Sequence, residues 1–310
     1  MLVVGGLHGN EPAGVHAIRR VLEQLERRRP QLRGELLAIS GNRRALAAGR
    51  RYIDRDLNRA WTPAQLSALR RRGPAPDIAE EAEQLEILEL VDDLEQRCGR
   101  PLTILDLHTT SAPGAPFVGM GDSYRNRRLA SALPIPTIIG LDELVAGAML
   151  AYLHDLGHVG VSIEGGQHER DDTVDRVESA LWLALVAAGM LAPGDVERGC
   201  DHHRRALARV CDGLPRIVDA RYRHRINPTQ GFVMDPGYSS FQRVRRGQRL
   251  AQDKRGPIKA PWTGRVLMPL YQREGNDGFF MAREYSRARL WVANLLRLPL
   301  RRPLPGRELP

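Results

Sequence analysis

Two histidines and a glutamate hold positions that suit the binding of a metal ion. His8 and Glu11 follow a β-favouring run that ends in the Gly5–Gly6 pair, and His108 follows the apolar run Leu102–Leu107. Because glycine adopts positive φ at low cost, the glycine pair permits a sharp exit from a strand. Two imidazoles and a carboxylate form a ligand set that catalytic zinc sites use, with a fourth position left for water or substrate. His-x-x-Glu alone is a weak signal, so His108 is the residue that makes a metal site the prediction.

A second carboxylate stands where it could exchange protons. Glu164 directly follows the apolar run Val159–Ile163 and precedes two glycines. Metal-assisted hydrolysis needs a base for the attacking water and an acid for the leaving group. We therefore predict Glu164 as the catalytic acid/base, the alternative being an exposed loop carboxylate. Asp106 shares a strand face with His108, because side chains alternate along a strand, and it could orient that imidazole.

The irregular polar stretch over residues 41–62, after the second predicted strand, suits the recognition of an anion. Its tyrosine, isoleucine and leucine favour an ordered, functional loop over a disordered one. Arginine binds carboxylates through two parallel hydrogen bonds and can stabilise an oxyanion. We expect substrate contacts from Arg51, Asn58 and Arg59. The alternative for both arginines is internal pairing with Asp54 and Asp56, which we expect to be structural partners.

The elements that must position these residues alternate between strand and helix over the first 190 residues. Helical spacing and capping signals predict helices at 11–29, 77–97 (N-capped by Asp77), 125–133, 143–156 and 172–190. Short β-favouring runs predict strands at the amino terminus and at 35–40, 102–107, 117–119, 137–140 and 159–163. This alternation implies a parallel or mixed sheet with helices on both faces. Such sheets bind ligands at the carboxyl ends of their strands.

The pattern changes near Pro193. Beyond it, β-favouring runs at 216–226, 232–234, 264–268 and 278–282 alternate with turn signals and predict a small all-β unit. We therefore expect a catalytic α/β domain over 1–197 and a C-terminal β domain over 198–297. The proline- and arginine-rich tail over 298–310 is expected to lack stable structure.

The net charge of +9 over 310 residues is unevenly distributed. Residues 1–200 hold 23 Lys and Arg against 28 Asp and Glu, whereas residues 201–310 hold 23 against 9. We expect the basic C-terminal third to be a solvated surface. Few aromatic residues accompany its arginines, so a nucleic-acid platform is not expected.

Other features of the chain are typical of a cytoplasmic protein. No apolar run approaches the roughly 20 residues of a membrane span, and we see no signal peptide. The first strand is shorter than expected, which would suit a late start-codon assignment or a truncation. Three scattered cysteines predict no disulfide framework. The spacing of Cys200, His202, His203 and Cys211 fits no standard zinc finger, and His168 is a secondary candidate for the site near Glu164.

Four motifs occur in order over about 160 residues: Gly6–Glu11, Arg51–Arg59, Asp106–Ser111 and Ile163–Gln167. Together they resemble the successive motifs of the succinylglutamate desuccinylase/aspartoacylase family, and 259–264 with 278–280 resembles the β domain of its bacterial members. The resemblance implies a zinc carboxypeptidase-like mixed sheet flanked by helices, with a smaller C-terminal all-β domain. It also implies one zinc ion (Zn2+) per chain on His8, Glu11 and His108, with Glu164 as acid/base and Arg51, Asn58 and Arg59 as substrate contacts.

The chain departs from the family pattern at two places. Aspartoacylases hold the acidic side chain of the substrate with an arginine upstream of the catalytic glutamate. Here that stretch offers His154 and His158 but no arginine, which argues against N-acetylaspartate as the substrate. A tyrosine that the family contributes from its β domain has Tyr271 as its candidate here.

We therefore predict a zinc-dependent hydrolase that cleaves the amide bond of a small N-acyl amino acid or a related N-acyl amine, using a zinc-activated water and Glu164. One alternative is a metallocarboxypeptidase acting on peptides, which a β domain capping the crevice would argue against. The other is a basic-surface binding protein with a vestigial metal site. The expected partner is the small-molecule substrate, with neither nucleic acid nor membrane, and the sequence leaves a homo-oligomer open.

Overall fold

The strands of the chain form one large and one small sheet in the computed structural model, which describes residues 1–75, 77–99, 101–285 and 300. The strands are β1 (Leu2–Gly5), β2 (Leu37–Ser40), β3 (Thr103–Thr110), β4 (Phe117–Met120), β5 (Thr137–Ile139), β6 (Val159–Gln167), β7 (Ile217–Arg225), β8 (Val233–Met234), β9 (Arg243–Val244), β10 (Arg249–Asp253), β11 (Gly256–Lys259), β12 (Gly264–Leu267) and β13 (Asp277–Glu284). In the described part of the chain, the large mixed sheet has the order β2-β1-β3-β6-β4-β5-β7-β13-β12-β9, and the small sheet has the order β11-β10-β8.

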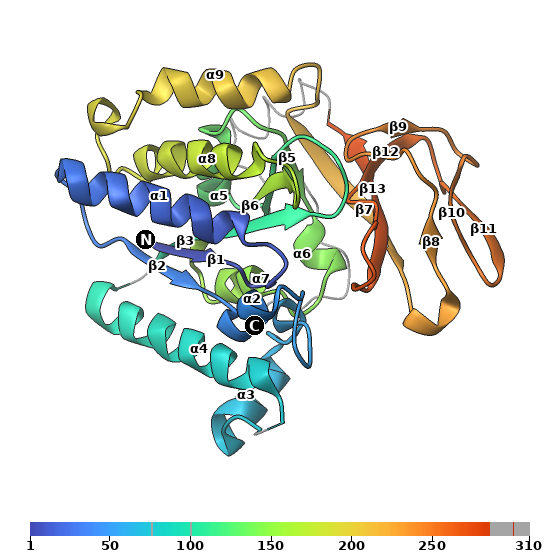
Figure 1. Ribbon diagram of the computed structural model, residues 1–310, viewed down its shortest axis with the longest axis horizontal. Coiled ribbons are helices and arrows are strands. Elements are labelled where there is room, and N and C mark those ends of the chain that lie inside the picture. Colours follow the sequence, from blue (N-terminus) through green and yellow to red (C-terminus); the bar gives the residue numbers. More distant parts are fainter. Residues whose placement is uncertain (76, 100, 286–299, 301–310) are drawn as a thin grey trace.

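Helices cover both faces of the first six strands of this order. They are α1 (Ala13–Arg28), α2 (Arg43–Ala48), α3 (Pro63–Arg72), α4 (Ala79–Cys98), α5 (Tyr124–Ser131), α6 (Leu141–Leu144), α7 (Met149–Asp155), α8 (Thr173–Ala187) and α9 (Cys200–Val210), with 3-10 turns η1 (Leu57–Arg59), η2 (Pro193–Asp195) and η3 (Pro228–Gln230). Helices α1, α5 and α8 pack on one face with α9 outside α8, and α4 and α7 pack on the other (Figure 1). Each face has its own apolar core. Among the described helices, none is long and apolar enough to cross a bilayer.

The central strands β1, β3 and β6 run parallel, so their carboxyl ends meet at one edge of the sheet. The register pairs His108 of β3 with Glu164 of β6. Because side chains alternate, Ile104 enters the core on the α4 face, and Asp106 and His108 follow on that same face toward the strand end. Strand β6 continues to Gln167, so Glu164 lies within a strand rather than after it.

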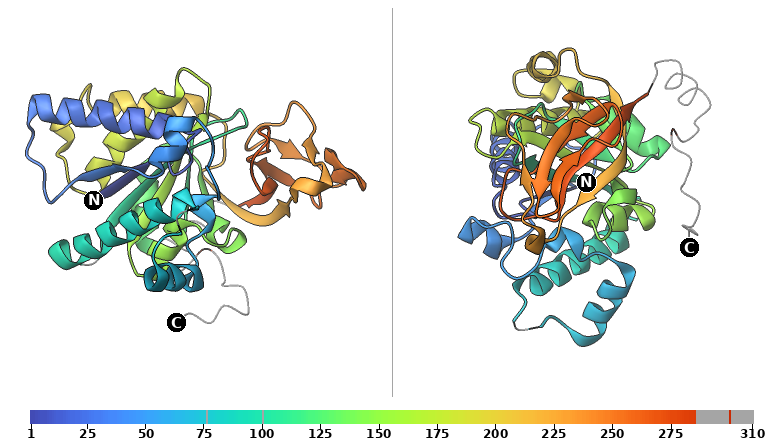
Figure 2. Two further views of the ribbon diagram at one scale, coloured as in Figure 1. Left: turned by 60° about the horizontal axis from the view of Figure 1, so that its bottom comes forward. Right: turned by 90° about the vertical axis from the view of Figure 1, so that its right-hand side faces the viewer.

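The C-terminal β region extends the main sheet rather than hanging from a linker. The first residues of β7 pair parallel with β5, and β7 pairs antiparallel with β13 from Val218 to Arg225. Figure 2 shows β8 to β13 projecting from one side of the helical part of the molecule. Helix α9, which begins at Cys200, packs on α8. The boundary expected between residues 197 and 198 stays a prediction, and the expected tail lies outside the described residues except for Leu300.

Two expected elements are wrong in detail, and the same loop explains both. The helix expected at 143–156 is broken into α6 and α7, because Gly147 (φ +77°) packs against the Arg59 carbonyl and its own carbonyl accepts from Trp61 N at 3.1 Å. Helix α4 begins at Ala79 rather than after an Asp77 cap. Its first N–H donates instead to Asp54 Oδ2 at 2.7 Å.

Candidate active site

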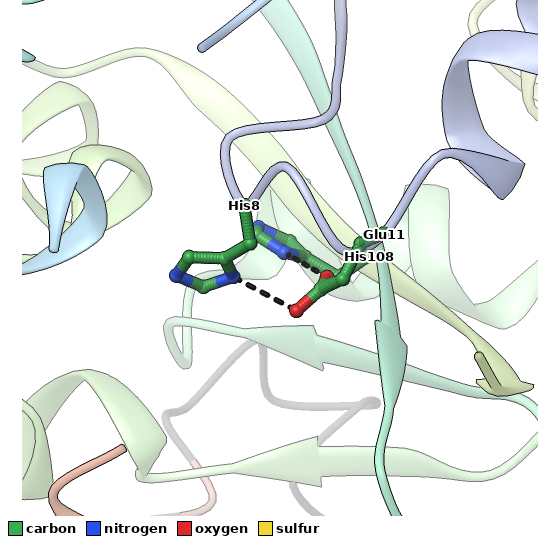
Figure 3. A group of neighbouring side chains, drawn as sticks. All are labelled: His8, Glu11 and His108. Carbon is green, nitrogen blue, oxygen red and sulfur yellow. Dashed lines mark hydrogen bonds and ion pairs between the residues drawn. The ribbon is translucent and has the colours of Figure 1, made fainter. Parts of the chain in front are cut away.

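His8, Glu11 and His108 are buried and lie together where β1 and β3 end (Figure 3). One potential ligand atom of each residue lies within 4.8 Å of the others. His8 Nδ1 is 2.9 Å from Glu11 Oε1, and His108 Nδ1 is 2.9 Å from Glu11 Oε2. The carboxylate therefore stands between two imidazoles that face it with the same nitrogen.

The loop between β1 and α1 is shaped by two of its glycines. Gly6 has a φ of +70°, which turns the chain out of β1. Gly9 lies so close to α2 that a Cβ would be 2.0 Å from the backbone carbon of Ala45. The Gly9 N–H donates to Arg51 O at 3.1 Å, so the loop that carries two of the clustered residues is tied to the arginine-bearing segment.

Aspartates hold the far nitrogen of each imidazole. His8 Nε2 is 3.0 Å from Asp56 Oδ1, and His108 Nε2 is 3.0 Å from Asp106 Oδ2. A neutral imidazole that donates its Nε2–H to a carboxylate keeps the Nδ1 lone pair for a cation. Two such Nδ1 atoms and the Glu11 carboxylate fit a divalent ion of the zinc type.

The electrostatics of the cluster also suit a cation. Burial alone would raise the pKa of Glu11, but the charge of His8 and hydrogen bonds from both histidines hold that pKa well below its usual value. Burial likewise would raise the pKa of Asp56, yet His8 and Arg51 keep it low. Two carboxylates therefore stay ionised in a buried place, where positive charge is stabilising.

Glu164 faces the same space from the neighbouring strand. Its side chain is partly buried and lines a cavity with the cluster. Within the described residues, its Oε2 atom is buried and has no hydrogen-bond partner. Burial raises the pKa of Glu164 to about 8, against the lowering effect of His108 and with a further raising effect of Glu11. A buried carboxyl with a free oxygen and a pKa near neutrality is suited to taking up and releasing a proton.

The Arg51 segment is held by buried carboxylates from two directions. Arg51 donates from Nε and Nη2 to Asp56 Oδ2 at 3.1 and 3.0 Å, and its Nη1 lies 3.5 Å from Glu11 Oε1. Glu80, fully buried at the start of α4, accepts from the backbone N–H of Ile53 and Asp54. The predicted partner role of Asp56 matches this geometry, although Asp56 also contacts His8.

Asn58 and Arg59 are fixed by contacts from distant parts of the chain. Asn58 Oδ1 accepts from Met149 N at 2.9 Å, which leaves the Asn58 amide nitrogen toward the cavity side, 3.5 Å from His108 Nε2. Arg59 donates to the Asn58 carbonyl at 2.7 Å and to Asp277 Oδ2 at 2.7 Å. Asp277 of β13 also pairs with Arg223 of β7. The C-terminal β region therefore sets the position of the Arg59 guanidinium.

A cavity of about 200 Å3 joins these groups. All seven residues predicted for the site line it: His8, Glu11, Arg51, Asn58, Arg59, His108 and Glu164. The candidates His154 and His168 line it as well. One of its walls comes from the C-terminal β region, through Met268, Leu270, Gln272, Gly275, Asp277 and Phe280.

A small network of polar side chains joins the cavity-lining part of the β region to the segments that follow β1 and end β3. Gln272 Oε1 accepts from Asn10 Nδ2 at 3.0 Å and lies 3.1 Å from His168 Nε2. His168 Nδ1 is 2.6 Å from Thr109 Oγ1. Tyr271, by contrast, points away from the cavity, since its hydroxyl donates to Asp235 O and accepts from a backbone N–H of the β region.

The histidines His203 and His158 lie outside this cavity, and their contacts indicate a structural role. His203 is buried and bonds to Ser179 Oγ at 3.0 Å and Glu197 O at 2.8 Å, so both of its ring nitrogens have partners within the fold. His158 contacts Leu102 N at 3.2 Å and Glu95 Oε1 at 2.7 Å between helix and strand. Across the described ranges, no group of metal-ligating side chains other than His8, Glu11 and His108 comes together.

Two important residues carried only weak signals in the sequence. Asp277 directly precedes the Gly278–Phe280 segment, and that position was the one available hint of its role. Glu80 belongs to an acidic helix start, which gave no sign that it is buried and organises the Arg51 segment. Both act through contacts that no local pattern encodes.

Comparisons with known proteins identify the family to which the chain belongs. They concern the chain as a whole: residues 1–180 match the family model described as succinylglutamate desuccinylase/aspartoacylase catalytic domain. A probable aspartoacylase from Synechococcus sp. is 31% identical over 239 residues, covering 73% of this chain and 67% of that protein. An N-acyl-aromatic-L-amino acid amidohydrolase from Rattus norvegicus is 38% identical over 111 residues, covering 36% of this chain and 33% of the rat protein.

A solved structure agrees with the fold over most of the chain. The succinylglutamate desuccinylase from Vibrio parahaemolyticus superimposes with a TM-score of 0.65 at 16% identity, covering 92% of this chain and 81% of that one. The mixed sheet flanked by helices and the C-terminal β region expected from the sequence are thus confirmed. The relatives found by sequence are named as amide-cleaving enzymes. By its catalytic-domain match and its similarity to curated members, the chain belongs to the succinylglutamate desuccinylase/aspartoacylase family.

Proposed function

We propose that this chain is a zinc-dependent deacylase that hydrolyses the amide bond of a small N-acyl amino acid or a related N-acyl amine, with one zinc ion per chain. The observation that carries the proposal is the buried group of His8, Glu11 and His108 facing Glu164 in one cavity. Family membership and the amidohydrolase names of the relatives support it.

His8, Glu11 and His108 would hold the ion, with Asp56 and Asp106 keeping both imidazoles in the orientation that offers Nδ1. A bound zinc ion would supply a Lewis acid for the scissile carbonyl and lower the pKa of water. The pairing of each imidazole with an aspartate also makes the histidines better electron donors.

Glu164 would carry the proton through the reaction. Its free Oε2 atom can accept a proton from the attacking water and return it to the nitrogen of the leaving amine. A carboxyl pKa raised toward neutrality makes both transfers accessible at physiological pH, because neither protonation state is strongly favoured.

The Arg51 segment would bind and orient the substrate. Arg51 is held rigid by Asp56, with Nη1 beside Glu11, so its guanidinium can face the oxygen on which negative charge develops. The Asn58 amide and the Arg59 guanidinium stand further along the cavity and suit the carboxylate of an amino acid.

The shape of the cavity favours a small amide over a peptide. The segment 268–280 of the β region closes one side of a cavity of about 200 Å3. A peptide extending from the scissile bond needs an open groove, which this wall obstructs. The peptidase alternative is therefore disfavoured.

Amine release from a panel of N-acetyl amino acids and from short peptides, at equal concentrations, tests the proposal. We expect hydrolysis of N-acetyl amino acids, little cleavage of peptides, and one zinc per chain by elemental analysis. Faster cleavage of peptides would favour a carboxypeptidase. Salt-sensitive retention of nucleic acid in a gel without hydrolysis of any amide would favour the basic-surface binding protein.

A further inference from the structure

The cavity continues beyond the metal-side residues into a region that we call the deep end, defined by Gly119, Gly121, Leu141, Leu150, Ala151 and His154. Ser162 and Glu164 point to the same face of β6, two residues and roughly 7 Å apart. Gly119 of β4 pairs with Ser162. The deep end therefore begins about one strand repeat beneath Glu164, on the side away from the strand ends.

The walls of the deep end are largely apolar. Leu150, Ala151 and His154 share one face of α7, at spacings of three and four residues. Leu141 of α6 lies beside β4, with its Cδ1 atom 3.6 Å from the position of a Cβ on Gly119. Ser162 completes the floor, and its hydroxyl donates to Gly119 O at 3.3 Å, so its proton is already used.

His154 is held as a neutral imidazole. Asn126 accepts from Gly160 N at 3.0 Å through Oδ1 and donates to Gly121 O at 3.0 Å through Nδ2. Its amide nitrogen therefore also faces His154 Nε2 and donates to it. An imidazole nitrogen that accepts a hydrogen bond carries no proton, and burial lowers the pKa of His154 further from protonation.

Positive charge is confined to the other end of the cavity. Among the described lining residues the cationic side chains are Arg51 and Arg59, paired with Asp56 and Asp277 respectively. Asp142, whose Oδ2 lies 3.1 Å from the position of a Cβ on Gly121, brings a carboxylate rather than a cation to the deep end. An anionic group entering there would lose its hydration without gaining a charged partner.

We infer that the deep end takes an uncharged, apolar substituent of the substrate. This rests on the proposed function and narrows it: the chain prefers N-acyl derivatives of apolar amino acids to those of aspartate or glutamate. The carboxylate of such a substrate is served by Asn58 and Arg59, and the apolar side chain fills the space between α7 and β4.

The direct test compares four substrates, N-acetyl-L-leucine, N-acetyl-L-asparagine, N-acetyl-L-aspartate and Nα-acetyl-L-ornithine, with the zinc-loaded protein. Leucine and aspartate side chains share their branching, so the pair separates charge from shape, and asparagine separates charge from polarity. We expect kcat/KM to fall in the order leucine, asparagine, aspartate, with at least about a 100-fold difference between the first and the last. A preference for aspartate or for ornithine overturns the inference while leaving the deacylase proposal intact.

A variant that adds a positive charge to the deep end should shift the preference from the leucine derivative toward the aspartate derivative. Ala151→Arg places a cation in the deep end and should raise kcat/KM for N-acetyl-L-aspartate about tenfold while lowering it for the leucine derivative. Ala151→Leu fills the same space without charge and should not improve the aspartate derivative. Glu23→Gln, an equal charge change on the exposed side of α1, is the matched control and should alter neither. Equal gains for Ala151→Leu and Ala151→Arg would contradict the role of charge.

Product binding keeps the two proposals distinguishable. L-leucine should raise the melting temperature of the zinc-loaded protein more than L-aspartate does at equal concentration. Absence of hydrolysis for all four amides would reject the deacylase proposal by itself. Stronger stabilisation by L-aspartate would reject the apolar deep end, whatever the activity.

Discussion

The two sides of the cavity are built differently. On the N-terminal side, titratable groups contact one another in a continuous set that runs from Asp106 through His108, Glu11 and His8 to Asp56. The wall from the C-terminal β region is mainly Met268, Leu270 and Phe280, with Asp277 as its charged member. The first side is the one that we propose to hold a cation and move protons. The second side shapes the space and fixes one arginine from outside.

The difference follows from where the backbone places each side. The residues proposed to take part in the reaction stand on or directly beside parallel central strands, whose carboxyl ends fix their spacing. The β-region wall belongs to a connection between antiparallel strands and to β13, which is a place where length and side-chain size can vary without disturbing the cluster. We therefore expect changes on the first side to abolish the chemistry and changes on the second side to alter substrate binding.

The largest effect is expected for His108→Ala. It removes an Nδ1 donor and leaves Asp106 and Glu11 with fewer partners, so zinc content should fall from one per chain to near zero and hydrolysis should be lost. Elemental analysis after gel filtration measures the metal. His202→Ala, an exposed histidine on α9, is the control and should keep both. Stoichiometric zinc in His108→Ala would remove His108 from the ligand set.

Glu164→Gln should separate metal binding from turnover. Glutamine keeps the shape but cannot accept and return a proton, so kcat should fall about 1,000-fold with zinc content unchanged. Glu169→Gln, at an exposed position on the same segment, should behave like the parent protein. Retention of full activity by Glu164→Gln would exclude Glu164 from the mechanism.

On the first side, Glu164 should also lower the stability of the folded protein, by an amount that depends on pH. The folded state raises the pKa of Glu164 to about 8, so between pH 4.5 and 8 the metal-free folded protein binds a proton that the unfolded chain does not. Glu164 therefore does not reduce the free energy of unfolding below about pH 4.5. It reduces that free energy progressively as the pH rises to about 8. Metal-free Glu164→Gln should therefore be as stable as the parent near pH 4.5 and more stable above pH 8, by on the order of 5 kcal/mol.

Urea unfolding of both metal-free proteins at several pH values measures that difference. Other carboxylates titrate in the same range, but they are common to the two proteins and cancel in the comparison. A difference in unfolding free energy that does not change with pH would mean that Glu164 is ionised in the folded state at neutral pH.

The contrast between the two sides also decides what the sequence could predict. The gathering of His8, Glu11, His108 and Glu164 around one cavity was predictable because each stands in or just after a recognisable strand, and neighbouring parallel strands end at one edge. The contact of Arg59 with Asp277 spans 218 positions and depends on how β13 pairs with β7, which no local pattern encodes. The division of the helix expected at 143–156 likewise arises because the Arg59 backbone packs against Gly147. Helical periodicity alone predicted one continuous helix.

Asp277→Asn tests the second side and should have the smallest effect. The substitution keeps the size of the side chain but removes the charge that pairs with Arg59 and Arg223, so the Arg59 guanidinium loses its fixed position. Since Arg59 is proposed to bind a substrate group that does not react, KM should rise about tenfold while kcat changes little. Asp235→Asn, which breaks the Arg249 pair elsewhere in the β region, is the matched control and should leave both constants unchanged. A fall in kcat comparable to that of Glu164→Gln would mean that the β region takes part in the chemical step, and the division between the two sides would fail.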